Sequence, residues 1–148
     1  MALDTYPLIV NLILERDDKI LMIYRENTTV YQNVYALPAG KVEKGESLKH
    51  NIIREAKEEI GITLHADDVS LAVTLWAKYN NESGDAIEDV GFFFKASRYE
   101  GDVVNAEPHK HGHVKWVALN DLPENSLTFT RVALEAYREG RDYVEYVG

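Results

Sequence analysis

Runs of apolar residues with the length of β-strands recur along this chain and are separated by polar segments. Five of them have the composition of strands, at positions 8–14, 20–24, 69–77, 89–96 and 114–119. The polar segment 15–19 joins the first two runs, which predicts a β-hairpin with a loop of several residues. Pro38 and Gly40 follow this hairpin, and we expect them to break any regular element there.

Two other segments show helical periodicity. The first covers 47–60, and Gly61 directly after it is well placed to end a helix in the left-handed conformation. The second covers 129–138 and is followed closely by Gly140. The order of strands, helix, strands and helix predicts an α+β fold in which a mixed sheet carries helices on its faces.

The composition is that of an ordinary globular protein, with 45% hydrophobic and 28% charged residues in 148 positions. No repeat, low-complexity run or flexible linker interrupts the chain, so we expect one domain over residues 1–148. The net charge of −9 argues against a nucleic-acid partner, because surfaces that grip nucleic-acid backbones are basic.

The absence of cysteine excludes disulfides, thiolate catalysis and cysteine-ligated zinc or iron–sulfur centres. The N-terminal residues lack the basic region and apolar core of a signal peptide. The longest apolar stretch, 8–14, is too short to cross a bilayer. We therefore expect a cytoplasmic protein without a membrane partner.

The first predicted helix carries three carboxylates on one side. At roughly 100° per residue, Glu55, Glu58 and Glu59 fall within an arc of about 100°. The neighbouring arc is apolar and consists of Ile52, Ile53, Ala56 and Ile60. Like charges at this spacing repel each other, and Arg54 and Lys57 are expected to point elsewhere. Clustered oxygen ligands suit Mg²⁺ or Mn²⁺, although a solvated acidic helix face has the same pattern.

The segment around this helix resembles the signature box of the Nudix hydrolases. It reads Gly40, five residues, Glu46, seven residues, then Arg54-Glu55-Ala56-x-Glu58-Glu59-x-Gly61-Ile62. Every polar and glycine position of the 23-residue pattern is present, and Ala56 stands where a larger aliphatic residue is usual. The resemblance implies the Nudix fold, an α/β/α sandwich with a mixed β-sheet and a loop–helix–loop box that binds divalent cations and the diphosphate of the substrate.

The same resemblance implies roles for the acidic residues of the box. Glu58 and Glu59 would be the principal ligands of Mg²⁺ or Mn²⁺, together with a backbone carbonyl of Ala39 or Gly40. Glu55 would be a further ligand or the base that activates water.

Further catalytic candidates lie beside these glutamates and beyond the box. Arg54 would orient a nearby carboxylate, and Glu46 would have a similar supporting role. Glu107 resembles the catalytic glutamate that nucleotide-sanitising Nudix enzymes place in this loop, but it is equally typical of an exposed loop glutamate.

Several residues are candidates for contact with the substrate. Arg25 stands where family members often place a phosphate-contacting base, or it is a surface arginine beside a strand. Lys41 is the second residue of the box, and Tyr31 or Tyr35 could stack on a nucleobase. The alternating histidines at 109–113 are expected to be exposed or at the substrate rim, because no fourth zinc ligand accompanies them.

The resemblance therefore implies a Mg²⁺-dependent hydrolase that cleaves a diphosphate linkage in a nucleotide derivative, and it allows a homodimer. The small size and the loop at Glu107 favour a (d)NTP pyrophosphohydrolase of the sanitising type, which releases a monophosphate and pyrophosphate. Dinucleoside polyphosphates are the second candidate substrate, because members that act on them tend to have a tyrosine at the distance past the box where Tyr79 stands. An ADP-sugar is a further alternative. The alternative to an enzyme is a sensor domain that binds a nucleotide without cleaving it. Such domains of the family usually lose one of the glutamates, whereas Glu55, Glu58 and Glu59 are all present here.

Overall fold

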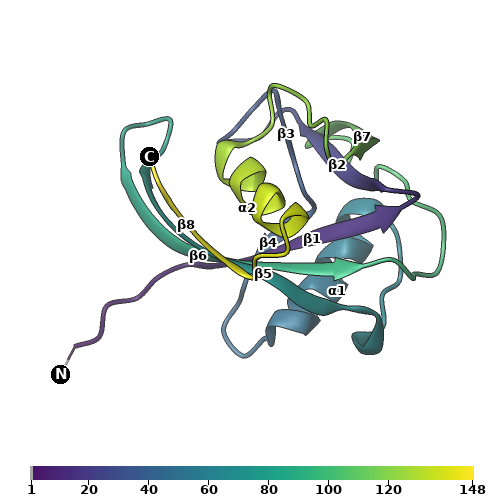
Figure 1. The fold of residues 1–148 in the computed structure, drawn as a ribbon, viewed down its shortest axis with the longest axis horizontal. Coiled ribbons are helices and arrows are strands. Elements are labelled where there is room, and N and C mark those ends of the chain that lie inside the picture. The colour runs from purple at the N-terminus through teal and green to yellow at the C-terminus, as the bar shows by residue number, and fades with distance from the viewer. Residues whose placement is uncertain (1) are drawn as a thin grey trace.

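A mixed β-sheet with one helix on each face forms the framework of the computed structural model, which describes residues 2–148 (Figure 1). The strands are β1 (Leu8–Arg16), β2 (Lys19–Arg25), β3 (Val34–Ala36), β4 (Ala39–Lys41), β5 (Ser70–Asn80), β6 (Ala86–Ala96), β7 (His111–Ala118) and β8 (Tyr143–Val147). The helices are α1 (Leu48–Ile60), α2 (Thr128–Arg138) and a 3-10 turn at Ala66–Asp68. No helix of the described residues is long and apolar enough to cross a membrane.

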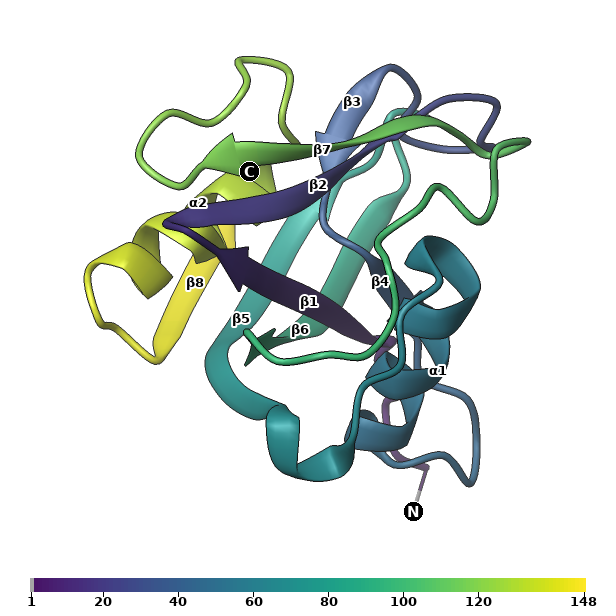
Figure 2. The ribbon, with the colours of Figure 1, turned by 90° about the vertical axis from the view of Figure 1, so that its right-hand side faces the viewer.

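The sheet has the order β3-β2-β1-β6-β5-β8, with β4 paired to β1 and β7 paired to β2. The pairs β1–β6 and β5–β8 are parallel, and the other pairs are antiparallel. Figure 2 shows β2, β3 and β7 together at one end, with β1 leading back to the rest of the sheet. The mixed sheet predicted from the sequence is therefore present.

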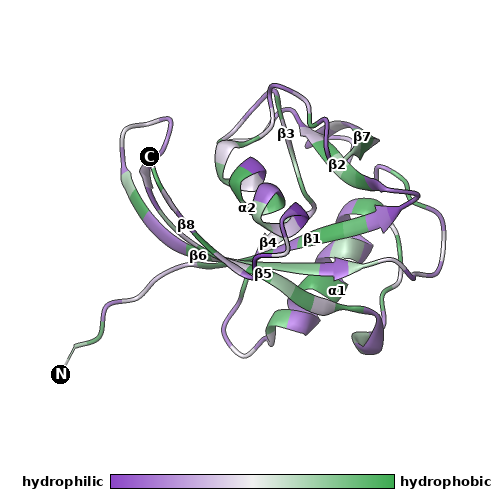
Figure 3. Ribbon diagram, in the orientation of Figure 1, coloured by the Kyte–Doolittle hydropathy of each residue, from purple (hydrophilic) through white to green (hydrophobic). Residues whose placement is uncertain are grey.

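The two faces of the sheet bury separate apolar clusters, because successive side chains of a strand point to opposite sides. On one face, α1 contributes Ile52, Ala56 and Ile60 to a cluster with Val10 and Leu12 of β1. On the other face, α2 contributes Ala133, Leu134 and Ala136 to a cluster with Leu75 and Phe93. Both helices carry apolar and polar residues side by side (Figure 3), as expected for helices that cover a sheet.

Some predicted boundaries were wrong. The first hairpin turns over only Asp17 and Asp18, whose φ angles of 52° and 62° suit a tight two-residue turn. The segment around Pro38 and Gly40 is not irregular throughout, because β4 pairs with β1 although Pro38 stops β3 before it. Strand β8 was missed, and it pairs with β5 far away in the sequence.

Both ends of α1 have clear local causes. The side chain of Ser47 accepts a hydrogen bond from the backbone N–H of His50 at 3.1 Å, which satisfies one of the free donors of the first turn. Gly61 ends the helix with φ of 75°, as its position in the sequence predicted. The N–H of Gly61 donates to the carbonyl of Lys57 at 3.2 Å.

We expect Gly61→Ala to lower the free energy of unfolding by more than about 1–2 kcal/mol, the cost of a left-handed non-glycine residue. The added Cβ would also lie 2.9 Å from Cγ2 of Val104. Gly45→Ala is the matched control, because Gly45 has φ of 83° and no atom within 4 Å of an added Cβ. Urea unfolding of both variants measures the difference, and equal losses would contradict a contribution from Val104.

Candidate active site

Arg54 lies at the centre of an ion-pair network on α1. Its Nε and Nη2 donate hydrogen bonds to the two carboxylate oxygens of Glu46, at 2.8 and 3.1 Å. Its Nη1 donates to Glu55 at 3.0 Å and to Glu58 at 3.1 Å. The expectation that Arg54 points away from the glutamates was therefore wrong, because its long side chain bridges positions that a helical wheel separates.

The loop before α1 is fastened to the helix through Glu46, whose side chain is only 10% exposed. Asn51 is fully buried, and its Nδ2 donates to Glu46 at 2.9 Å and to the carbonyl of Lys41 at 3.0 Å. The hydrogen bonds from Arg54 and Asn51 lower the pKa of Glu46 to about 2, because they stabilise the charged carboxylate. Glu46 is thus a charged anchor for Arg54 at neutral pH.

The buried Glu59 and the half-buried Glu55 form a pair of carboxyl groups between α1 and β4. The N–H of Ala39 donates to Glu59 Oε2 at 3.3 Å, and the two carboxyl groups are close enough for each to influence the pKa of the other. Burial raises the pKa of both groups, and the nearby Glu55 raises the pKa of Glu59 further. Glu55 lies against Gly40, where an added Cβ would overlap its carboxyl group. The first glycine of the box therefore makes room for this pair.

The acidic residues do not already form a full set of metal ligands. Among residues 2–148, no three acidic or histidine side chains converge on one point as ligands of an ion would. Arg54 explains part of this, because it holds Glu58 and one oxygen of Glu55.

The chemistry of the donors nevertheless fits a hard divalent cation. Glu55 and Glu59 place carboxyl oxygens beside the backbone of Ala39 and Gly40, and no sulfur or imidazole ligand competes there. The pKa values of both acids are raised because burial takes their negative charges out of water without full compensation. A divalent cation between them would supply that compensation.

Glu107 lies in the loop that leads to β7 and packs against the end of α1. The N–H of Ala106 donates to the backbone carbonyl of Glu59 at 3.1 Å, and the charge of Glu107 contributes to the raised pKa of Glu59. Glu107 is half-buried and lies 3.5 Å from Lys110 Nζ. It is therefore close to the carboxyl pair and is not a fully exposed loop residue.

A cavity of about 390 Å³ opens beside β4, on the sheet face that carries α2. Its polar lining residues are Asn11, Arg25, Lys41 and Asp89, and its aromatic ones are Tyr31, Tyr79, Phe93 and Phe129. Ala39 and Gly40 also line it, although their other neighbours are Glu59 and Glu55 of α1. Strand β4 thus stands between the carboxyl pair and a cavity of the size that small ligands occupy.

Three of the four predicted substrate residues line this cavity, namely Arg25, Tyr31 and Lys41. Arg25 is partly committed to its own loop, because its Nε donates to the carbonyl of Tyr31 at 3.1 Å. Tyr35 lies outside the cavity, and its hydroxyl is 2.8 Å from Nε2 of His113.

The alternating histidines do not share one environment. His111 is only 4% exposed, so the expectation of an exposed stretch was wrong for this residue. Burial lowers its pKa, and its Nδ1 has no hydrogen-bond partner among residues 2–148. His109 and His113 are exposed, and His113 stacks on Tyr24 with ring centroids 5.0 Å apart. Within the described part of the chain these histidines form no zinc site.

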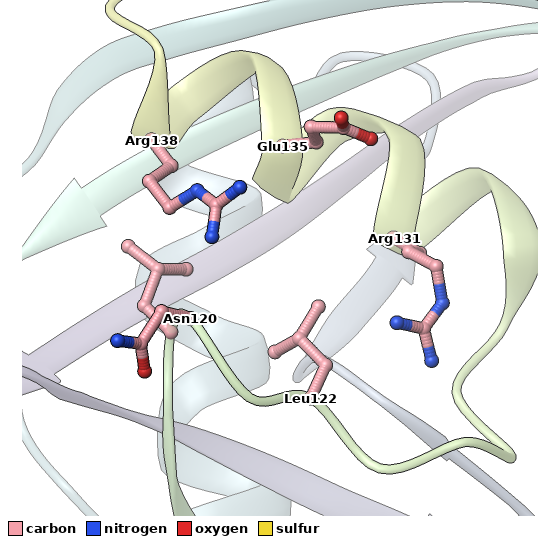
Figure 4. Close-up of a pocket in the computed structure, with 6 residues that line it drawn as sticks. Asn120, Leu122, Arg131, Glu135 and Arg138 are labelled. Carbon is pink, nitrogen blue, oxygen red and sulfur yellow. The ribbon is translucent and has the colours of Figure 1, made fainter.

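A smaller pocket of about 240 Å³ lies between α2 and the loop that follows β7 (Figure 4). Arg131, Glu135 and Arg138 come from α2, and Asn120 and Leu122 face them from the loop. None of the predicted site residues lines this pocket, so it is separate from the box.

Sequence reasoning missed three residues that line the main cavity, namely Asn11, Asp89 and Phe129. Only Asn11 left a signal in the sequence, because it is a polar residue inside an otherwise apolar strand. Asp89 and Phe129 come from distant segments that only the fold brings together.

Comparison with known proteins agrees with this geometry. The NUDIX domain family matches residues 5–138. The protein belongs to the Nudix hydrolase family. An uncharacterised Nudix hydrolase of Bacillus subtilis, YvcI, is 31% identical over 116 residues, which cover 77% of this chain and 67% of the relative. A crystal structure of a MutT Nudix hydrolase from Burkholderia pseudomallei has a TM-score of 0.78 and 28% identity, covering 89% of this chain and 98% of the other.

Two further relatives of this Nudix hydrolase match over shorter segments. An ADP-ribose pyrophosphatase of Methanocaldococcus jannaschii is 46% identical over 50 residues, covering 34% of this chain and 29% of the relative. A CTP pyrophosphohydrolase of Escherichia coli is 39% identical over 54 residues, covering 36% of this chain and 40% of the relative. Each match spans less than half the length of that relative.

We expect Glu46→Gln to lower the melting temperature of this MutT-like protein most strongly near neutral pH. Because the pKa of Glu46 is lowered from 4.5 to about 2 on folding, its charge stabilises the folded state above pH 4.5. This stabilisation is lost as the pH falls toward 2, so the difference between wild type and variant should shrink. Melting curves from pH 7 to pH 3 measure it, with the exposed Glu43→Gln as control, and a difference independent of pH would contradict the assignment.

Proposed function

We propose that this Nudix hydrolase uses Mg²⁺ or Mn²⁺ to cleave the diphosphate linkage of a nucleotide derivative, most suitably a nucleoside triphosphate. The observation that carries the proposal is the carboxyl pair of Glu55 and Glu59 against β4, with the cavity beside the same strand. The diphosphate would lie at the carboxyl groups, and the nucleoside would enter the cavity.

The residues that would hold the metal are Glu55, Glu58 and Glu59, with a backbone carbonyl of Ala39 or Gly40. A bound divalent cation would neutralise the phosphate oxygens and make a water molecule easier to deprotonate. Glu58 is exposed and bound only through Arg54, so it can turn toward an ion without rearranging the core. Such exposed ion pairs contribute little to stability.

The chain itself would position the groups and accept the proton. Glu46 fixes Arg54, and Arg54 in turn orients Glu55 and Glu58. Water adds to one phosphorus, the bridging P–O bond breaks, and the proton of the water passes to a carboxylate. Glu55 is the first candidate for this role, which it would take in place of a role as metal ligand, because burial raises its pKa, and Glu107 is the second candidate.

A triphosphate would be cut to a monophosphate and pyrophosphate. The half-buried Glu107 near Glu59 supports this substrate class, since nucleotide-sanitising members of the family place a catalytic glutamate in this loop. The match to an ADP-ribose pyrophosphatase favours an ADP-sugar as a second candidate. Both substrates share a nucleoside joined to a diphosphate.

The deciding experiment incubates the purified protein and Mg²⁺ with nucleoside triphosphates, ADP-ribose and dinucleoside polyphosphates. Ion-exchange chromatography of the products should show a nucleoside monophosphate and pyrophosphate from a triphosphate. Tight binding without cleavage of any compound would instead identify a nucleotide-binding sensor domain.

We expect Glu58→Gln to lower kcat/KM by at least about 100-fold and to leave the melting temperature nearly unchanged. Loss of a metal ligand should cost more than the 10–100-fold typical of residues that only support one. Glu124→Gln is the control, because Glu124 is an equally exposed carboxylate before α2. Full activity of Glu58→Gln would remove Glu58 from the metal site.

A further inference from the structure

The loop between β2 and β3, residues 26–33, holds a bulky residue in a strained backbone conformation. Tyr31 has a φ of 54°, and Asn27 and Asn33 of the same loop have φ of 49° and 59°. Asparagine tolerates this left-handed region, whereas a large side chain with a positive φ is an outlier. Such residues persist only where the surrounding structure holds them, and they cluster at ligand clamps and switch regions. The conformation of Tyr31 therefore points to a function at the site.

Contacts of both its side chain and its backbone hold Tyr31 in place. Its ring meets the ring of Phe129 edge-on with centroids 5.8 Å apart, and its hydroxyl donates to the hydroxyl of Tyr79 at 3.2 Å. Tyr79 stacks on Phe129 in turn, with ring centroids 5.6 Å apart. Behind the rings, Nε and Nη2 of Arg25 donate to the carbonyls of Tyr31 and Val30, each at 3.1 Å. Tyr31, Tyr79 and Phe129 thus form one aromatic wall, which Arg25 supports from the loop side.

This aromatic wall separates the main cavity from a neighbouring cavity of about 310 Å³. Tyr31, Tyr79 and Phe129 line both cavities, together with Leu127. Strand β4 contributes residues to the main cavity but not to the neighbouring one. The neighbouring cavity therefore lies on the far side of the aromatic wall from the carboxyl pair, and it extends to Asn81 in the turn after β5.

We propose that Tyr31 is a specificity-determining residue, which ends the main cavity and limits how far a substrate can extend from its diphosphate. The nucleoside fills the main cavity, and its base faces the aromatic wall. A base with a bulky substituent on that side collides with the ring of Tyr31, so the protein rejects it. This inference rests on the proposed function, because it concerns the size of the substrate at the same site.

Tyr31 is the member of the aromatic wall that can be removed without opening the core. Tyr79 and Phe129 pack against the apolar cluster beneath α2, whereas Tyr31 belongs to a loop. Glycine adopts a positive φ without steric cost, so Tyr31→Gly fits the backbone as it stands. Without the ring, the two cavities join and a longer ligand has room.

The first test compares ATP with N6-benzyl-ATP, which carries an added aromatic ring on the exocyclic amine of the base. We expect the ratio of kcat/KM for the benzyl compound to kcat/KM for ATP to rise at least about tenfold in Tyr31→Gly, because the clash is gone. Tyr31→Phe keeps the ring and should keep the ratio of the wild type. An unchanged ratio in Tyr31→Gly overturns the proposal.

Asn27→Gly is the matched control for the backbone of the loop. It places a glycine at another left-handed position of the same loop, and Asn27 lines neither cavity. We expect the wild-type ratio in this variant. A rise equal to that of Tyr31→Gly would assign the effect to a more flexible loop and would overturn the role of the tyrosine ring.

A substituent on the ribose tests the direction in which the cavity is extended. The anthraniloyl ester of ATP carries a similar added ring on its sugar, which lies nearer to the diphosphate than the base does. We expect Tyr31→Gly to leave the ratio of kcat/KM for this ester to that for ATP unchanged. An equal gain for the ester and the benzyl compound would mean that the variant only loosens the site, and this result also overturns the proposal.

Binding without chemistry distinguishes this proposal from the hydrolase proposal. Titration calorimetry without a divalent metal compares AMP with N6-benzyl-AMP, and we expect the wild type to bind AMP at least about tenfold more tightly. If Tyr31→Gly removes this preference but no nucleotide is cleaved, the hydrolase proposal fails and the role of Tyr31 stands. If ATP is cleaved but the wild type binds both monophosphates equally, the role of Tyr31 fails and the hydrolase proposal stands.

Discussion

The ion pair between Arg54 and Glu46 is the interaction on which the site depends. It crosses from the loop to the helix, and the same guanidinium holds Glu55 and Glu58, which would otherwise repel each other. One cation therefore pairs with three glutamates, whereas Glu59 has no basic partner and its pKa is raised by burial and by the neighbouring Glu55. A divalent cation beside Glu59 would supply the positive charge that this carboxyl group lacks.

The sequence alone was sufficient to predict those elements that depend only on residues close to them in the chain. The apolar stripe of α1, its capping Ser47 and the terminal Gly61 all act within a few residues, and so the helix was predicted close to its observed bounds. Strand β8 could not be predicted, because only pairing with β5, more than sixty positions earlier, makes it a strand. The direction of Arg54 was mispredicted because a helical wheel does not describe the reach of a long side chain.

The acidic box was evident from spacing alone, but the cavity was not. Its walls come from β1, the 25–41 region, β5, β6 and the start of α2, and no local pattern relates these segments. Asn11 and Gly91 both line the cavity, but they lie far apart in the sequence and meet only because β1 and β6 pair with each other.

Strand β4 is only three residues long, and it separates the acidic helix from the cavity by the width of a single chain. A molecule that uses both sides must straddle this barrier, so the linker between its charged and aromatic parts has a minimum length. On the proposed function, a nucleoside joined to its phosphates would meet this minimum length, whereas inorganic pyrophosphate would contact the acidic side alone.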